Sequence, residues 1–175
     1  MAEADGFAAA IAIVLAHEGG FQDSSDDAGN WTGGRVGAGT LKGTKFGISA
    51  AQYPTLDIAN MTTDEVAAIY RRDWWDRFGL DALPAPLATK LLDAGVNIGM
   101  VDAVTALQRA LRACGRSIAE DGKLGLLTRA AAASMSSDIL LPALREALAG
   151  HYRLVAAHDP AGSRFLPGWL ARAYS

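Results

Sequence analysis

The segment AHEGGF at residues 16–21 places one acidic residue at the end of an apolar stretch and follows it with two glycines. The apolar residues before Glu18 predict a buried helix, and Gly19 or Gly20 supplies the left-handed residue that ends it. A helix C-terminus carries a partial negative charge, which favours the protonated form of a carboxyl group. Glu18 is therefore either a solvated residue at a helix end or a general acid beside a surface that the two glycines leave open.

A second set of polar residues follows Glu18 at short spacing. Asp27 lies nine residues after Glu18, and Thr32 lies five residues after Asp27. A carboxylate and a hydroxyl placed opposite a protonated acid can hold an attacking water, as the hydrolysis of a glycosidic bond requires. Asp26 could replace Asp27, and Asp23 is a weaker third candidate. Each of these aspartates, taken singly, is also typical of a residue that caps a turn.

Other chemistry has weaker support. No second histidine follows His17 at helical spacing, and His151 and His158 stand seven residues apart without an acidic partner pattern, so we expect no metal and no cofactor. The helical spacing around Trp74 and Trp169 favours burial over sugar stacking. The aromatic residues considered for stacking on sugar rings are Trp31, Tyr53, Trp74, Trp75 and Trp169.

Helices are predicted over most of the chain, and they must position these residues. Thr62 and Glu65 form a capping box, and Ser137 is the expected cap of the longest helix, with Pro142 in its first turn. The predicted helical segments are 7–17, 64–78, 86–99, 102–114, a short alanine-rich stretch from Thr128, 139–158 and part of 165–175.

Residues 21–49 have a different character. Seven glycines fall between Gly29 and Gly47, with short β-prone pieces and no helical period. No Gly-Lys-Ser/Thr ending is present, so a phosphate-binding loop is not favoured. The sequence predicts a mainly α fold with a small irregular, glycine-rich lobe or β-hairpin near the N-terminus.

Composition narrows the classes further. The chain has 175 residues and a formal net charge of -3, and this negative charge argues against general nucleic-acid binding. Its single cysteine excludes an internal disulfide. The apolar run from Phe7 to Leu15 is too short for stable membrane insertion. Glu3 and Asp5 stand where a signal peptide would carry positive charge, so we expect synthesis in the cytoplasm without a signal peptide.

Several segments, taken in order, resemble the glycoside hydrolase family 108 muramidases, which are bacterial and phage lysozymes with an EGG motif. HEGGF at 17–21, Asp27, Thr32 and TKFGIS at 44–49 resemble the N-terminal signature of that family. The segments that resemble its accompanying peptidoglycan-binding part are LLDAGVNIG at 91–99, ALQRAL at 106–111, DGKLGLLT at 121–128 and PGWLARA at 167–173.

The resemblance implies a lysozyme-like helical fold. It also implies cleavage of the β-1,4 bond between N-acetylmuramic acid and N-acetylglucosamine in peptidoglycan, with Glu18 as proton donor. The order Glu18, Asp27, Thr32 is similar to that of phage-type lysozymes, which makes these three the expected catalytic residues. The expected substrate-binding residues are Gly19, Gly20, Trp31, Lys45, Phe46 and Gly47.

The resemblance further implies an endolysin of phage or prophage origin that lyses or remodels the cell wall. Its partner would be the glycan strands of peptidoglycan, which it would reach in the periplasm or outside the cell after release through a phage holin. We expect it to act as a monomer. We expect 1–85 to be the catalytic part and 86–175 the peptidoglycan-binding-like part of one integrated domain, 1–175.

Two alternatives remain open at this stage. A lytic transglycosylase would use the same glutamate and leave an anhydro sugar instead of adding water. A wall-binding or secretion-assisting protein with the same fold would have no turnover.

Overall fold

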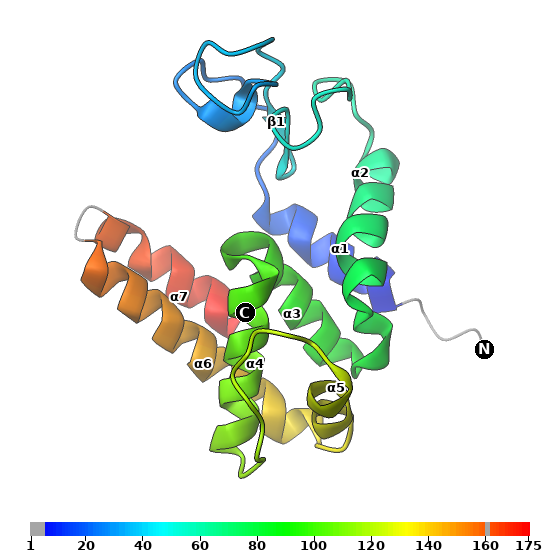
Figure 1. Ribbon diagram of the computed structural model, residues 1–175, viewed down its shortest axis with the longest axis vertical. Helices are drawn as coiled ribbons and strands as arrows, with labels where there is room; N and C mark the ends of the chain where they lie inside the picture. The colour runs from blue at the N-terminus through cyan, green and yellow to red at the C-terminus, as the bar shows by residue number, and fades with distance from the viewer. Residues whose placement is uncertain (1–5, 160–161) are drawn as a thin grey trace. The chain divides into compact units, whose positions relative to one another are not determined.

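The computed structural model describes residues 6–159 and 162–175. The chain divides into two compact units, one of Phe7–Arg77 and one that contains Phe78–Ser175. Helices make up most of the chain, which confirms the predicted mainly α class, and only one small sheet occurs in the described residues (Figure 1). The α-helices are α1 (Gly6–His17), α2 (Thr63–Tyr70), α3 (Ala85–Ile98), α4 (Met100–Ala113), α5 (Leu126–Ala133), α6 (Ser137–His158) and α7 (Leu166–Tyr174).

The first unit contains α1, an irregular lobe and α2. The predicted capping box of α2 is confirmed, since Thr62 Oγ1 accepts from the Glu65 amide at 3.2 Å and the Glu65 carboxylate accepts from the Thr62 amide at 2.8 Å. A π-helical segment, Arg71–Asp76, continues α2. Its Trp75 packs edge-on against Phe7 of α1, with ring centroids 5.5 Å apart.

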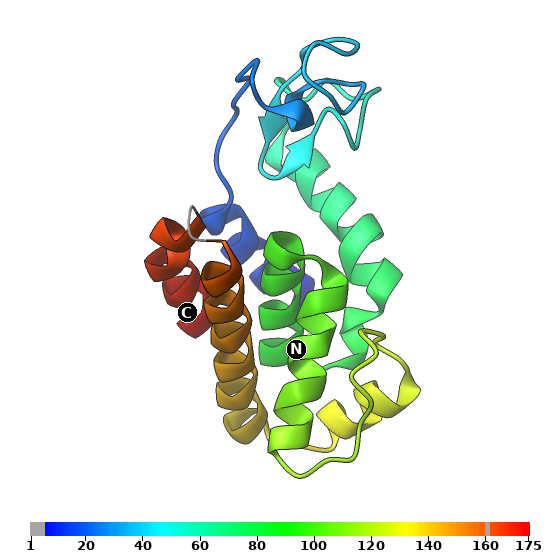
Figure 2. The ribbon, with the colours of Figure 1, turned by 60° about the vertical axis from the view of Figure 1, so that its left-hand side comes forward.

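The lobe holds the only sheet of the described residues. Strands β1 (Thr44–Lys45) and β2 (Ile48–Ser49) pair antiparallel, with Thr44 opposite Ser49 and Lys45 opposite Ile48 (Figure 2). Before them comes a 3-10 turn, Ala28–Asn30. Asn30 is fully buried and bonds through its side chain to Gln22, Ser24 and Thr44. These bonds order a segment with few apolar residues, and the predicted irregular lobe with a hairpin is confirmed.

The second unit is built from packed helices. The helix pairs α3–α4, α4–α6, α3–α6 and α6–α7 are in contact, and Figure 1 shows α6 and α7 side by side. Their apolar stripes form the core, as the predicted helical spacing requires. Its fully buried leucines are Leu80, Leu87, Leu91, Leu92, Leu107, Leu111, Leu140 and Leu144.

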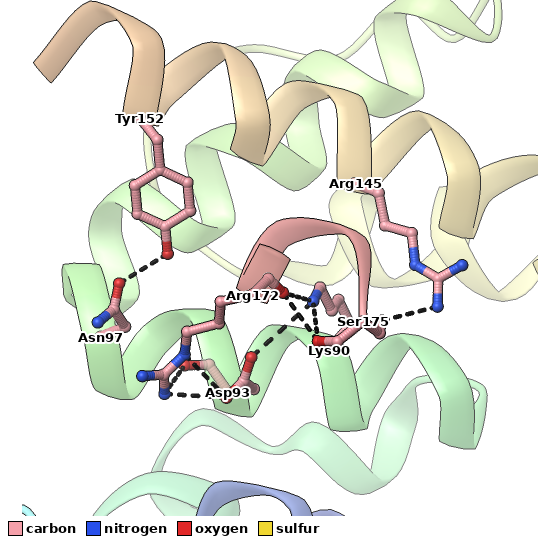
Figure 3. Close-up of polar contacts among 7 residues, drawn as sticks. All are labelled: Lys90, Asp93, Asn97, Arg145, Tyr152, Arg172 and Ser175. Carbon is pink, nitrogen blue, oxygen red and sulfur yellow. Dashed lines mark hydrogen bonds and ion pairs between the residues drawn. The ribbon is translucent and has the colours of Figure 1, made fainter. Parts of the chain in front are cut away.

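A cluster of charged groups lies inside this helical unit (Figure 3). Arg172 of α7 contacts the Asp93 carboxylate at 2.9 Å, and Lys90 Nζ lies 3.9 Å from the same carboxylate. Lys90 also donates to the Arg172 backbone carbonyl. Burial lowers the pKa of Lys90, more than Asp93 raises it. The cluster therefore attaches α7 to α3 through charge-assisted hydrogen bonds.

Four local predictions need correction. Ser136, not Ser137, caps α6, because its side chain accepts from the Asp138 amide. Pro142 consequently lies beyond the first turn, inside the helix. The predicted helix 64–78 changes to π-helical geometry at Arg71, and Trp75 is only 1% exposed, so it offers no surface for sugar stacking.

Two further points concern organisation. The boundary between the compact units falls after Arg77, earlier than the expected division at residues 85 and 86, and one integrated domain stays a prediction. Among the helices that the structure describes, none combines the length and apolar character needed to cross a membrane.

Candidate active site

Glu18 directly follows the last residue of α1. Its backbone N–H donates to the Val14 carbonyl at 2.9 Å, which completes the final turn of the helix, and the residue is partly buried. A Cβ placed on Gly19 or Gly20 would have no neighbour within 4 Å. The surface after Glu18 is therefore open on the side of these two glycines, as the sequence predicted. The predicted left-handed helix end is wrong, because neither Gly19 nor Gly20 has a positive φ.

The turn of the β1–β2 hairpin lies beside this helix end. Both turn residues have a left-handed backbone, with φ of +48° at Phe46 and +76° at Gly47. Two positive φ values in a two-residue turn are typical of a type I′ hairpin, which matches the twist of its strands. The Phe46 N–H donates to the Gly19 carbonyl at 3.1 Å. This bond holds the turn against the segment that follows Glu18.

Tyr70 of α2 fixes the same turn from below the surface. The side chain is 1% exposed, and its hydroxyl donates to the Phe46 carbonyl at 2.9 Å. Sequence reasoning assigned Tyr70 only to the apolar spacing of its helix. The available signal was the phenol itself, because a buried tyrosine hydroxyl needs a hydrogen-bond partner.

Gly47 is the point where the turn, the carboxyl group and the phenol meet. A Cβ on this residue would lie 2.6 Å from the Tyr70 hydroxyl oxygen and 3.2 Å from Glu18 Oε2. The first distance is too short for any side chain, and a φ of +76° also disfavours one. Gly47 thus allows the turn backbone to approach Glu18 without a side chain in between.

Asp27 occupies a structural position in the lobe. It caps the 3-10 turn, because its Oδ1 accepts from the Gly29 amide at 2.8 Å, and its Oδ2 accepts from Gln22 Nε2 at 3.0 Å. Thr32 Oγ1 accepts from the Thr40 amide at 2.9 Å. Both side chains therefore stabilise loops, and their catalytic roles stay predictions.

Two of the expected substrate-binding side chains also have internal partners. Trp31 donates its indole N–H to the Ser25 carbonyl at 2.9 Å. Lys45 Nζ donates to the carbonyls of Ala59 and Met61 at 2.9 and 2.8 Å, so its ammonium ties β1 to the segment before α2. Substrate contact by Trp31 and Lys45 stays a prediction.

An ion pair on the π-helical segment supplies the largest resolved pKa shifts of this unit. Hydrogen bonds from the Arg72 guanidinium hold the pKa of the Asp73 carboxyl at about 2. The Tyr53 hydroxyl donates to Asp73 Oδ2 at 2.7 Å, and burial followed by that bond raises the pKa of Tyr53 to about 12. Tyr53 is thereby held against the π-helical segment and is not presented as a free stacking ring.

A pocket of about 340 Å³ lies in the lobe close to Glu18 along the chain. Its exposed ring is Phe21, which rests on the backbone of Gly43, where a Cβ would lie 2.6 Å from the ring. Sequence reasoning missed Phe21, although an aromatic residue directly after EGG was visible. The lining residues are Phe21, Asp23, Leu41, Lys42, Thr55, Asp57, Ile58 and Ala59.

No group of three or more histidine, cysteine or acidic side chains suited to a metal ion occurs in residues 6–159 and 162–175. The chemistry that the described residues offer is that of one carboxyl group at an open helix end, with a fixed backbone turn beside it.

Comparison with known proteins assigns this arrangement to a family. The model of the family described as Glycosyl hydrolase 108 matches residues 11–99, more than half of the chain and the whole of the region around Glu18. The chain belongs to glycosyl hydrolase family 108. A second model, described as Predicted Peptidoglycan domain, matches residues 102–174. The match to family 108 confirms the resemblance seen in the EGG segment.

A solved structure extends the comparison. The structure of Brucella abortus SagA shares 26% sequence identity with this chain and superposes with a TM-score of 0.70. The match covers 96% of this chain and 89% of that chain. No curated protein matches. Membership of family 108 makes this protein a glycoside hydrolase, and the second model indicates peptidoglycan as its partner.

Proposed function

We propose that the protein is an N-acetylmuramidase with Glu18 as general acid. It would cut the β-1,4 bond between N-acetylmuramic acid and N-acetylglucosamine in peptidoglycan. The observation that supports this role is the convergence of Glu18 Oε2, Gly47 and the Tyr70 hydroxyl at the open end of α1. A carboxyl group with a side-chain-free turn beside it has room for a glycosidic oxygen.

In the proposed reaction, Glu18 gives its proton to the glycosidic oxygen as the bond from that oxygen to C1 of N-acetylmuramic acid breaks. Positive charge develops at C1, and Glu18 is left as a carboxylate. A water then adds to C1, and the proton that it loses is returned to the Glu18 carboxylate, which leaves a neutral product and restores the acid. Asp27 and Thr32 are the residues proposed to orient that water. Phe21 offers an apolar ring face for an adjacent sugar.

One observation favours the alternative of a lytic transglycosylase. Both Asp27 oxygens and Thr32 Oγ1 accept hydrogen bonds from their own loops. If these residues are structural only, the C6 hydroxyl of the muramic acid would attack C1 and return its proton to Glu18, giving a 1,6-anhydro end. Glu18 has the same role in both reactions, so the products distinguish them.

The test is mass spectrometry of fragments released from purified peptidoglycan by the wild type, Glu18→Gln and Asp27→Ala. We expect reducing-end N-acetylmuramic acid from the wild type, none from Glu18→Gln, and reduced but measurable release from Asp27→Ala. Glu65→Gln is a matched control, because it makes the same change at an exposed glutamate and glutamine also completes a capping box. Anhydro ends would establish the transglycosylase, and no fragments at all would leave a wall-binding protein.

The proposal includes the setting of the reaction. The protein would act as a monomer on the glycan strands, in the periplasm or outside the cell, after holin-dependent release as an endolysin. Size-exclusion chromatography with light scattering, and lysis from within cells with and without a co-expressed holin, would test these two points.

A further inference from the structure

A groove of about 440 Å³ lies between α4 and α6 in the helical unit, and the reaction proposed above does not use it. Each helix contributes one stripe of side chains at intervals of three or four residues. Its lining residues are Asp102, Thr105 and Arg109 from α4, His151, Leu154, Val155 and His158 from α6, and Asp159 after it.

The two ends of the groove differ in charge. Figure 2 shows α4 and α6 running in opposite directions, so the start of α4 lies beside the end of α6. Asp102 is therefore at the same end as His158, and Arg109 is at the end of His151. The helical rise separates Asp102 from Arg109 by about 10 Å.

The middle of the groove is apolar and open to solvent. Leu154 and Val155 are 57% and 37% exposed, although both line a concave surface. The lining contains no phenylalanine, tyrosine or tryptophan, which are the usual platforms for sugar rings. A neutral glycan strand would therefore gain little from these residues.

The acidic end is equipped to accept hydrogen bonds. His158 Nδ1 lies 2.8 Å from the Leu154 carbonyl oxygen. Because a carbonyl only accepts, Nδ1 carries the hydrogen, and Nε2 of the neutral ring is an acceptor. Asp102 adds a carboxylate from the first turn of α4. An ammonium group, which has donors only, matches these two side chains.

The basic end is equipped to donate. Arg109 contacts Glu120 through Nε at 2.9 Å. A guanidinium has five donors in a planar fork, so the terminal nitrogens can bind a second carboxylate while Nε stays on Glu120. His151 lies at the same end.

These features describe a ligand with an ammonium and a carboxylate about 10 Å apart and an apolar part between them. Three residues of extended peptide span about that length. Resting on the proposed function, we propose that the α4–α6 groove binds the peptide stem of peptidoglycan, with the side-chain ammonium of its diamino acid at Asp102 and a stem carboxylate at Arg109. Residues 102–159 would then supply a binding site for the peptide part of the substrate whose glycan Glu18 is proposed to cut.

The binding test is calorimetric titration of the full chain with a synthetic stem tripeptide that ends in a diamino acid and keeps its side-chain ammonium free. We expect Arg109→Gln and Asp102→Asn each to weaken the Kd about tenfold, the usual effect of losing one charge-assisted hydrogen bond. Acetylating the ammonium of the tripeptide should weaken binding to the wild type by a similar factor. It should cause no further loss in Asp102→Asn.

Two matched controls isolate the groove. Arg112 also pairs with Glu120, at 3.3 Å, but does not line the groove, so Arg112→Gln should bind the tripeptide like the wild type. Asp138 stands in the first turn of α6 as Asp102 does in α4, so Asp138→Asn controls for the helix dipole. Equal losses in Arg109→Gln and Arg112→Gln, or no binding by the wild type, would overturn the proposal.

A separate assay keeps this inference distinct from the proposed function. Glycan strands freed of peptide by an amidase are offered to the wild type, and reducing ends are counted. Cleavage of these strands without tripeptide binding would refute the stem site and leave the muramidase standing. Tripeptide binding without cleavage of any peptidoglycan would refute the muramidase and support the stem site.

Discussion

The two compact units of this chain are ordered by different interactions. In Phe7–Arg77, the lobe between α1 and α2 depends on polar side chains. Lys45 bonds to two backbone carbonyls, and Asn30 bonds to the Ser24 carbonyl and to the side chains of Gln22 and Thr44. In the helical unit, apolar stripes form the core, and the charged groups inside it are gathered in the Lys90–Asp93–Arg172 cluster.

The difference shows how one chain combines an accessible surface beside Glu18 with a closely packed helical unit. Side-chain bonds to carbonyls can hold a backbone in place without covering it, which leaves Gly19, Gly20 and Gly47 accessible beside Glu18. Substitutions in each unit can therefore distinguish the polar hydrogen bonds that order the lobe from the apolar packing and the charged cluster that order the helical unit.

The largest expected effect is in the helical unit. Asp93→Ala leaves Arg172 and Lys90 without their buried partner, which costs about 3–5 kcal/mol of the free energy of unfolding. Urea denaturation measures this value. Lys90→Met is the matched control, since Asp93 keeps Arg172, and it should cost clearly less. Equal losses would show that the cluster acts through packing instead of charge.

The next effect is in the lobe. Asn30→Ala leaves Gln22, Thr44 and the Ser24 carbonyl without their shared partner, which we expect to cost about 2 kcal/mol. Hydrogen exchange should show lost protection at the amides of Gln22 and Thr44, with α4 unchanged. Asn60→Ala removes only one exposed bond and should leave exchange as in the wild type. Lost protection throughout α4 would contradict separate ordering of the units.

A smaller change tests the hydrogen bond that joins α2 to the turn beside the proposed acid. Tyr70→Phe removes the hydroxyl that holds the Phe46 carbonyl, at a cost of about 1 kcal/mol, and we expect about a tenfold fall in wall-lysis rate. Tyr152→Phe is the control, because that buried hydroxyl bonds Asn97 in the helical unit at 2.6 Å. Similar activity in both variants would remove Tyr70 from the site.

The smallest expected effect depends on pH. The folded-state pKa of Asp73 is about 2, below its unfolded value, so its stabilisation is present above about pH 4 and is lost as the pH falls towards 2. Asp73→Asn should therefore be less stable than the wild type at pH 6 and nearly equal at pH 2. Thermal unfolding over this range measures the difference. A constant gap between the two proteins would exclude ionisation of Asp73 as the cause.

The sequence predicted the helices well because their spacing and caps are local, as Thr62 and Glu65 show. It predicted the position of Glu18 at a helix end for the same reason. It could not predict that Tyr70 reaches the Phe46 carbonyl, because that bond joins residues 24 apart. Nor could it show that Asp27 is a capping residue in its loop, since capping and catalysis use the same carboxylate.

The left-handed backbone at Phe46 has a consequence for protein engineering. Asparagine or glycine adopts this conformation more easily than phenylalanine, by about 1 kcal/mol or more. A search for heat-tolerant forms would therefore select substitutions at this position early. The same substitutions would remove an aromatic ring from the neighbourhood of the proposed acid, so thermal tolerance and substrate recognition would compete at a single residue.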